Sequence, residues 1–270
     1  MSSLTARPSS PPSSPPSSPP SRRRITAEIL IVLGLSLGAS AVYSIVAIVN
    51  RVTTAKALSQ QTATINAPLS DRPVFDLIYQ LLSIVFDLVP VALVAFLLWQ
   101  VTRPHLGRLG LDLARPRRDL GWGVLLALCI GLPGIGLYLA SRALDLGVTV
   151  VPTALDSHWW TVPVLVLAAL RAALQEEVIV VGYLFARLRD LGWGTWPIIV
   201  LTAVLRGSYH LYQGYGAFLG NAAMGLLFGW LYSRYGRLLP LVVAHFLIDT
   251  AVFVGYPWAA SAFPTLFGAP

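Results

Sequence analysis

The stretch TVPVLVLAALRAALQEEVIVVGYLFA, residues 161–186, decides the class of fold. It is long and apolar enough for a helix that crosses a bilayer, which takes about 20 such residues. Glu176 and Glu177 nevertheless stand side by side within it. An ionised side chain at mid-bilayer costs about 2.5–3.5 kcal/mol or more unless it is paired or hydrated, so such residues are functional candidates. The stretch therefore predicts a membrane helix that carries part of a polar site.

The composition of the whole chain extends this prediction. Of its 270 residues, 56% are hydrophobic and 11% are charged, and the mean hydropathy is +0.69. Soluble domains carry about 25% charged residues, so lipid is the main solvent of this protein. The net charge of +7 comes from basic residues between apolar runs, which is typical of membrane topology and contact with anionic headgroups. We expect the lipid bilayer as a partner and no nucleic acid.

Seven apolar runs predict an all-α, polytopic helical bundle with seven transmembrane helices, or eight if one run is divided. They cover residues 25–50, 73–101, 119–141, 161–186, 195–212, 217–234 and 238–256. The SSPP repeats before them cannot bury apolar surface, so the N-terminus is a predicted disordered tail. The predicted organisation is a cytoplasmic tail (1–24), N-terminal transmembrane helices (25–160), a polar-bearing helical core (161–256) and a C-terminal tail (257–270).

The basic residues set the orientation. With the tail inside, thirteen arginines fall on the inner side, whereas four basic residues, Arg51, Lys56, Arg72 and Arg142, fall outside. Inner loops of membrane proteins carry the excess of Lys and Arg. We therefore expect a multi-pass protein of the cell membrane with a cytoplasmic N-terminus.

Two local patterns are assigned to packing rather than chemistry. GLSLG, residues 34–38, matches a nucleophile motif that requires a strand–turn–helix elbow, but it lies within a predicted membrane helix, so Ser36 is not assigned as a nucleophile. The pairs Gly34/Gly38 and Gly225/Gly229 predict close helix packing. The single cysteine, Cys129, excludes an internal disulfide and a cysteine-based zinc site.

Ionisable residues gather in the apolar runs of the C-terminal half. His245 and Asp249 are four residues apart and share a helical face, and Arg206 and His210 have the same spacing. If the stretches meet around Glu176, they form a carboxylate–histidine–histidine–aspartate cluster. A carboxylate in such a dry site can act as a general base.

Two readings of this cluster involve no hydrolysis. Paired polar groups can bridge helices without chemistry, and a chain of ionisable groups can carry protons or ions. Glu176 and Glu177 lie about 100° apart on a helix. One can therefore face a site while the other meets a neighbouring helix.

The order of the motifs resembles the CPBP family of intramembrane proteases, which includes the CAAX prenyl endopeptidase and bacterial Abi proteins. The resemblance rests on EExxxxG at Glu176–Gly182, a histidine near the end of the following span, and HxxxD at His245–Asp249. The segment LFGWLYSRYGRLLPLVVAH, residues 227–245, is similar to the family's approach to its last motif. The resemblance covers residues 164–255, about a third of the chain. The arginine excess, 18 of 19 basic residues, indicates a GC-rich, actinobacterial-like member.

The resemblance implies an endopeptidase that hydrolyses a peptide bond of a membrane-embedded or membrane-associated peptide. Glu176 would be the general base and His210 its partner, while His245 and Asp249 would bind the oxyanion. Zinc, held by Glu176, His210 and His245, is the one cofactor that the resemblance allows. Asn221 is a supporting candidate because it could hydrogen-bond across helices near the site.

Two positions depart from the family's usual EExxxR and FxxxH motifs: Val181 replaces the arginine and Arg206 replaces the phenylalanine. An arginine at position 181 would lie one turn from Glu177, which we count among the catalytic residues, and would pair with it. We hypothesise that Arg206 supplies this guanidinium from the next helix. If it does not, the chain would be a catalytically degenerate scaffold or a bacteriocin-immunity-type protein. A small-solute or proton carrier is the remaining alternative.

Overall fold

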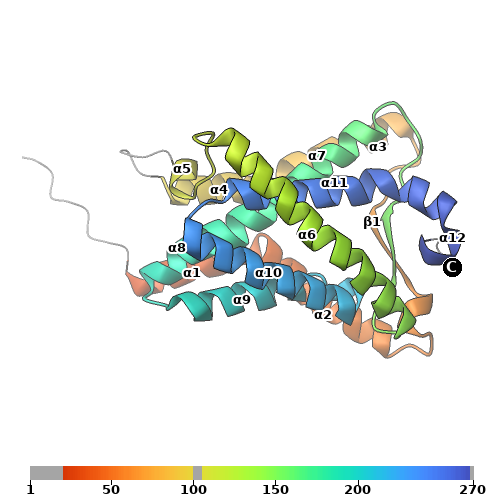
Figure 1. Cartoon of the computed structure of the whole chain (residues 1–270), viewed down its shortest axis with the longest axis horizontal. Coiled ribbons are helices and arrows are strands. Elements are labelled where there is room, and N and C mark those ends of the chain that lie inside the picture. Colours follow the sequence, from red (N-terminus) through yellow and green to blue (C-terminus); the bar gives the residue numbers. More distant parts are fainter. Residues whose placement is uncertain (1–20, 100–104, 268–270) are drawn as a thin grey trace, which may run out of the picture.

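The computed structural model describes residues 21–99 and 105–267. Residues 1–20 of the predicted tail lie outside the described residues. The described part is nearly all-α, and its helices run along the long axis of the molecule (Figure 1). The N-terminal half contains α1 (Arg22–Gly34), α2 (Leu37–Val52), η1 (Leu58–Gln60), β1 (Thr62–Asn66), α3 (Pro73–Asp87), α4 (Val89–Leu97), α5 (His105–Arg108) and α6 (Pro116–Ala143).

In the C-terminal half, residues 161–186 fall in three consecutive helical segments. This half contains β2 (Thr149–Thr153), α7 (Thr161–Glu176), the π-helix η2 (Glu177–Tyr183), α8 (Leu184–Asp190), α9 (Thr195–Ser208), the 3₁₀ turn η3 (Leu211–Gln213), α10 (Tyr215–Tyr235), α11 (Leu239–Ala262) and α12 (Pro264–Phe267).

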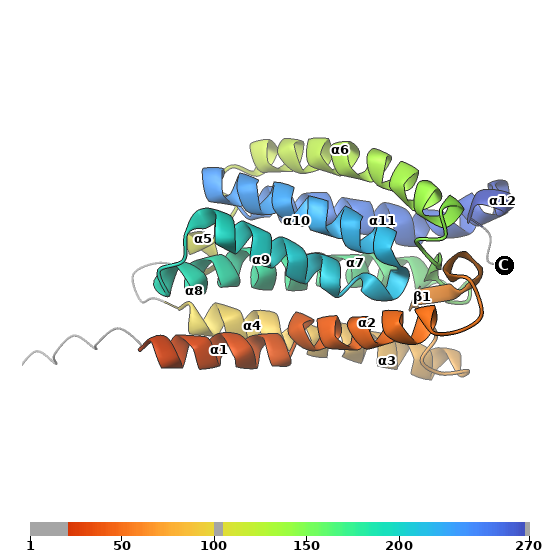
Figure 2. The ribbon, with the colours of Figure 1, turned by 90° about the horizontal axis from the view of Figure 1, so that it is seen from below.

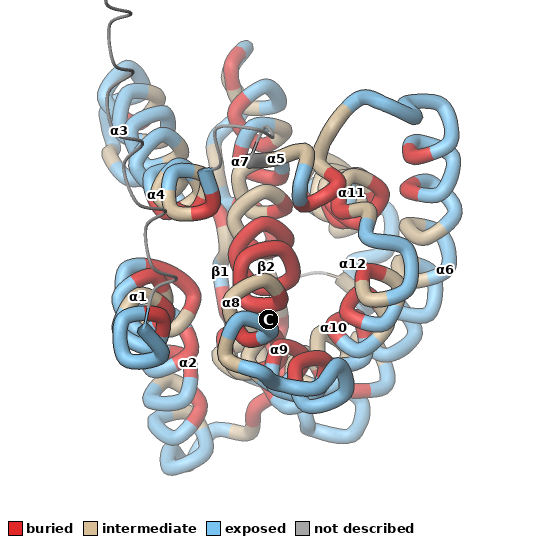
Figure 3. The backbone as a smooth tube through the Cα atoms, turned by 90° about the vertical axis from the view of Figure 1, so that its left-hand side faces the viewer, coloured by how far each residue is buried: buried red, intermediate tan, exposed pale blue. Residues whose placement is uncertain are grey.

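The helices form three layers, which are seen edge-on in Figure 2. One layer consists of α1 to α4, the middle layer of α7 to α9 with η2, and the third of α6, α10 and α11. The middle layer is the most deeply buried, and every residue from Val178 to Phe185 is buried (Figure 3). This apolar run is thus covered on all sides by protein, which a helix without a polar face requires.

Three helices are long and apolar enough to cross a membrane: Pro73–Leu97, Pro116–Ala143 and Leu239–Ala262. The bent pair α1–α2 makes up to four, judged by length and composition only. Each of the seven predicted runs coincides with helix, but the count of seven or eight transmembrane helices is not confirmed. The reason is that α9 is a shorter apolar helix and the run at residues 161–186 is divided by η2.

The predicted uninterrupted span over residues 25–50 is wrong in detail. It is two helices that meet at an angle of 55°, with Ser36 at the break. The Ser36 hydroxyl donates to the Val32 carbonyl at 2.6 Å, a side-chain bond that competes with regular helix geometry. A side chain at Gly34 would meet nothing within 4 Å, so the Gly34/Gly38 pair is not a packing contact. Ser36 lies at a helix–helix bend and not at a strand–turn–helix elbow.

A two-stranded parallel sheet is the one feature that an all-α prediction misses. β1 pairs with β2 in the register Thr62↔Thr149, and the Asn66 side chain donates to the Pro152 carbonyl at 2.8 Å. Both strands lie in segments that connect helices, and each has only five residues. Strands this short leave little periodicity to detect in the sequence.

Residues predicted on the inner side gather at one end of the bundle. There Arg22 donates to the carbonyl of Leu191, and Arg237 pairs with Asp112 and Asp119. At the opposite end, Arg51 bonds Gln61 and the Thr62 carbonyl, and Arg142 donates to the carbonyl of Leu266. The two groups of basic residues thus occupy opposite ends, as the predicted topology requires.

Candidate active site

The two adjacent glutamates lie where α7 becomes the π-helix η2. Glu176 is the last residue of α7 and Glu177 the first of η2, and both are buried. π-helical turns of this kind are found frequently at functional sites. Although the helix wheel separates the two side chains, both carboxylates approach Arg206 of α9. The neighbours of the two carboxylates otherwise differ, since Glu177 faces α11 and Glu176 faces the turn after α9.

Arg206 has no exposed surface, and the same is true of Glu177. Arg206 Nη1 lies 2.7 Å from Glu177 Oε1, and its Nη2 lies 3.4 Å from Glu176 Oε2. The Nη1 approach is too oblique for a hydrogen bond, so the contact with Glu177 is an ion pair. The guanidinium carbon lies 5.4 Å from the centroid of the Phe228 ring, which adds a cation–π contact in this dry environment.

His245 joins α11 to the same cluster. Its Nδ1 lies 2.9 Å from Glu177 Oε1 and 3.1 Å from Arg206 Nη2. Its Nε2 lies 3.3 Å from Asp249 Oδ2, so the two residues share a helical face as their spacing predicts. Both ring nitrogens therefore face carboxylate oxygens of the protein.

His210 does not share a helical face with Arg206, because α9 ends at Ser208. At Gly207 a side chain would come within 2.8 Å of the Phe218 carbonyl, and the chain then turns, with the His210 amide donating to the Gly207 carbonyl. The turn still brings His210 Nε2 to 3.8 Å from Glu176 Oε2. Within the described part of the chain, neither ring nitrogen of His210 has a hydrogen-bond partner. The predicted shared face is wrong, but the predicted meeting with Glu176 is found.

The geometry just described lies in a segment with known relatives. Residues 158–251 match the family model described as type II CAAX prenyl endopeptidase Rce1-like. Over these residues, about a third of the chain, the sequence is similar to the CAAX protease, or CPBP, family. The matched segment contains both glutamates, both histidines and Asp249, whereas the helices before residue 158 lie outside it. No curated protein and no solved structure matches the chain.

The match to this peptidase family and the apolar helices together indicate a multi-pass membrane protein. Its site departs from the family pattern at Val181 and Arg206. Val181 is buried in η2 among apolar neighbours, and Arg206 lies within ion-pair distance of Glu177. One guanidinium is thus present beside Glu177, and α9 supplies it.

The structure adds Tyr209 to this site. Its hydroxyl donates to Glu176 Oε2 at 2.8 Å, and its ring lies 4.8 Å from that of His210. Its position beside a candidate histidine was the only signal in the sequence. Asn221 is placed differently from its prediction, because its side chain bonds the Ala217 carbonyl of its own helix and not a neighbouring one.

The turn that carries His210 is anchored by distant parts of the chain. The Tyr212 amide donates to the Ser44 hydroxyl of α2 at 2.7 Å, and the Val148 amide donates to the Gln213 carbonyl at 3.2 Å. Gly214 has a φ of 105°, and a side chain there would lie 2.5 Å from the Cα of Gly147. These contacts fix the turn, and hence His210, relative to Glu176.

A zinc ion held by Glu176, His210 and His245 does not fit this arrangement. The described residues include no group of three His, Cys, Asp or Glu side chains placed to hold a metal ion. The guanidinium of Arg206 lies between Glu176 and His245, and this permanent cation would repel a divalent metal. The geometry favours a guanidinium, rather than a metal ion, as the cation of this site.

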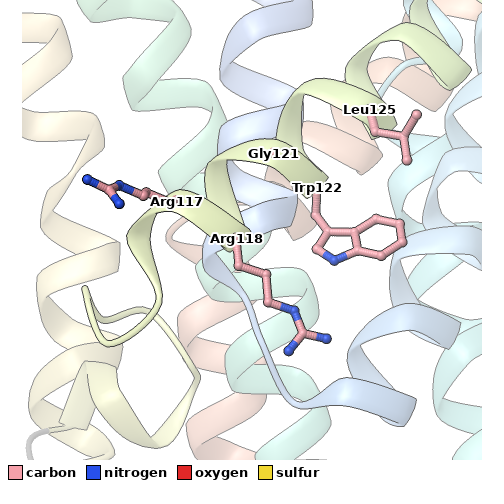
Figure 4. Close-up of a pocket in the computed structure, with 5 residues that line it drawn as sticks. All are labelled: Arg117, Arg118, Gly121, Trp122 and Leu125. Atoms are coloured by element: carbon pink, nitrogen blue, oxygen red, sulfur yellow. The ribbon is translucent and has the colours of Figure 1, made fainter.

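A separate pocket lies at the start of α6, far along the chain from the glutamates. Its volume is about 250 Å³, and its lining consists of Arg117, Arg118, Gly121, Trp122 and Leu125 (Figure 4). Arg118 and Trp122 extend to the same side of the helix, whereas Arg117 extends away from them. Basic and tryptophan side chains at a helix end are typical of a membrane interface. The pocket contains none of the catalytic candidates.

Proposed function

We propose that this chain is an intramembrane endopeptidase that hydrolyses a peptide bond of a membrane-embedded or membrane-associated peptide. The observation that carries the proposal is the meeting of Glu176 and His210 beside a buried ion-pair cluster. The His210 side chain is 19% exposed and its ring nitrogens have no partner among the described residues. Its buried ring nitrogens thus have unused hydrogen-bonding capacity, which one enclosed water molecule can satisfy. The match to a peptidase family supports the same reaction class.

Glu176 and His210 are spaced to hold one water molecule between them. The 3.8 Å between Nε2 and Oε2 exceeds a direct hydrogen bond, and a bridging water satisfies both groups. Glu176 removes a proton from this water as its oxygen attacks the carbonyl carbon of the scissile bond. The tetrahedral intermediate then collapses with cleavage of the C–N bond. The proton held by Glu176 passes to the leaving amine, whose nitrogen keeps the electron pair of the broken C–N bond.

His245 and Asp249 complete the proposed machinery on the oxyanion side. The Asp249 side chain is 21% exposed, whereas His245 is buried and faces carboxylates with both nitrogens. An ionised Asp249 would repel the developing oxyanion, so the proposed role requires Asp249 to act as an O–H donor. Because the site is enclosed, this one donor acts in a medium of low dielectric constant and its effect is large.

The rival reading is a non-catalytic scaffold or immunity-type protein, or a carrier. A scaffold needs only polar groups that satisfy one another across helices. Arg206, Glu177 and His245 contact one another across helices, whereas neither ring nitrogen of His210 has a hydrogen-bond partner among the described residues. The unpaired histidine beside Glu176 is the feature that favours hydrolysis.

The decisive experiment measures proteolysis by the purified protein in lipid nanodiscs against a library of membrane peptides. We expect cleavage by wild type and a rate about 10²–10⁴-fold lower in Glu176→Gln. Asp87→Asn is the matched control, because Asp87 is an intramembrane carboxylate that pairs with Arg171 outside the cluster. The proposal fails if folded wild type cleaves nothing, or if Glu176→Gln cleaves at the wild-type rate.

The proposal includes the topology. Seven helical units, with α1–α2, α3–α4 and α7–α8 each counted once, would cross the bilayer, with the N-terminus in the cytoplasm of the cell. The opposite placement of the two groups of basic residues supports this orientation.

A further inference from the structure

A single guanidinium contacts three ionisable groups of the site. Arg206 lies within 3.4 Å of Glu176, Glu177 and His245, and these three residues come from three helical segments, α7, η2 and α11. Two adjacent carboxylates in a dry environment repel each other strongly unless a cation lies between them. The planar fork of arginine can meet both at once, which a lysine ammonium cannot do with fixed geometry.

The two carboxylates use this guanidinium differently. Glu177 has no exposed surface, and its Oε1 contacts both Arg206 and His245. Glu176 is touched by Arg206 only at 3.4 Å and accepts a stronger bond from Tyr209, while its side chain retains 11% exposure towards His210. Glu177 is therefore held through Oε1 by two partners and has no exposed surface, whereas the Glu176 side chain stays 11% exposed.

We infer that Arg206 is the positioning residue of the site: it fixes Glu177 as a structural anchor and thereby holds Glu176 at His210 as the base. The inference rests on the proposed function for the role of Glu176. It assigns Glu177 to positioning rather than to contact with substrate. It also makes Arg206 the fixed positive charge of a site whose donors do not fit a metal.

The apolar surroundings of the Arg206 side chain can be altered without changing any polar group. Its Cδ would lie 3.3 Å from a side chain at Gly225, and the same side chain would come within 2.8 Å of the Ala203 Cα. The Ala203 backbone cannot shift without a large energetic cost. Gly225→Ala must therefore move α10, which carries Gly225, away from α9 and displace the guanidinium. Gly255→Ala is the matched control, since a side chain there would meet nothing within 4 Å.

The test measures kcat, KM and the melting temperature of Arg206→Lys, Arg206→Met, Gly225→Ala and Gly255→Ala in nanodiscs. Misplacing a reacting group by about 1 Å can cost about 100-fold. We expect kcat to fall at least 100-fold in Arg206→Met and about tenfold in Arg206→Lys and Gly225→Ala, with KM within threefold of wild type. Gly255→Ala should match wild type.

The inference is overturned if folded Arg206→Met keeps kcat within threefold of wild type. If Arg206→Met does not fold, Arg206→Lys and Gly225→Ala decide, and wild-type kcat in both would overturn it. A purely structural arginine would lower the melting temperature and leave the kcat of the folded fraction unchanged.

A stability measurement, which does not depend on catalysis, tests this inference independently of the proposed function. Melting temperatures of Glu176→Gln, Glu177→Gln and Arg206→Met, alone and in pairs, form two double-mutant cycles. We expect non-additive shifts in both cycles, whether or not wild type cleaves peptides. Additive shifts for the Arg206–Glu176 pair would overturn the inference even if the enzyme proves to be a peptidase. Absence of cleavage with both cycles coupled would reject only the proposed function.

Discussion

Arg206 of α9 and Glu177 of η2 form an ion pair, 2.7 Å from Nη1 to Oε1, in which neither side chain has any exposed surface. Burying this pair costs desolvation free energy for both ions. Their mutual attraction offsets that cost only while both ions are present. The pair therefore makes the site sensitive to the loss of either partner, and it links two segments that the chain keeps apart.

Removing one partner should destabilise the protein more than removing both. Arg206→Met leaves Glu177 buried without its cation and should cost about 3–5 kcal/mol of unfolding free energy. The double variant Arg206→Met/Glu177→Gln should recover most of that loss. Unfolding in detergent, followed by tryptophan fluorescence, measures both. Equal stability of the single and double variants would contradict the pair's energetic role, and the exposed Arg118→Met serves as control.

The Tyr209 hydroxyl should matter for catalysis through its bond to Glu176 Oε2. Tyr209→Phe removes a hydrogen bond to an ionised group, which contributes about 1.5–3 kcal/mol, so kcat should fall by about tenfold or more. Tyr212→Phe is the matched control, because its hydroxyl accepts from Gln213 instead. Steady-state kinetics on one cleaved peptide compares them, and equal kcat values in the two variants would show that Glu176 does not need Tyr209.

Peptide cleavage should not depend on a metal ion. The guanidinium of Arg206 lies between two of the three donors that a zinc site would use. Treatment with 1,10-phenanthroline or EDTA should leave kcat unchanged, and elemental analysis should find far less than one zinc per chain. Loss of activity with chelator, restored by added zinc, would reverse this assignment.

Asp112 should contribute to stability only above its folded-state pKa. The amide of Ala114 and the Arg237 side chain both donate to its carboxylate, and they lower its pKa below the usual value of 3.8. A lowered folded-state pKa stabilises the protein above the unfolded-state pKa, and this contribution is lost as the pH falls through the folded-state pKa.

The melting temperature of wild type should therefore fall more steeply below about pH 4 than that of Asp112→Asn. Melting curves from pH 3 to 7 measure the difference. Parallel curves for the two proteins would mean that the Asp112–Arg237 contact is absent in solution.

Cysteine labelling can test the proposed orientation, because the chain has one cysteine. In a Cys129→Ser background, Lys56→Cys should react with a membrane-impermeant maleimide on intact cells. Ser21→Cys should react only after the membrane is permeabilised. The reverse pattern would place the N-terminus outside.

Much of the fold follows from local sequence because lipid and buried protein both select apolar runs. Among the described residues, each of the seven runs is largely helical, and His245 and Asp249 share a face as their spacing predicts. The bend at Ser36 and the end of α9 at Ser208 do not follow from the hydrophobic period of their runs. At Ser36 the hydroxyl bonds the Val32 carbonyl one turn earlier in the same run, and at Gly207 the close approach of Phe218 leaves no room for a side chain.

The sequence by itself determined the membrane class, the helical runs and the residue types of the site, since all three depend on hydrophobicity and short spacings. Only the tertiary structure decided which partner each charge takes. Arg206 reaches Glu177, Tyr209 reaches Glu176, and Asn221 turns back to its own helix. These partners depend on how the helices pack and on where a π-helical turn rotates a side chain. They could not be predicted because contacts between distant segments leave no periodic signal in a single sequence.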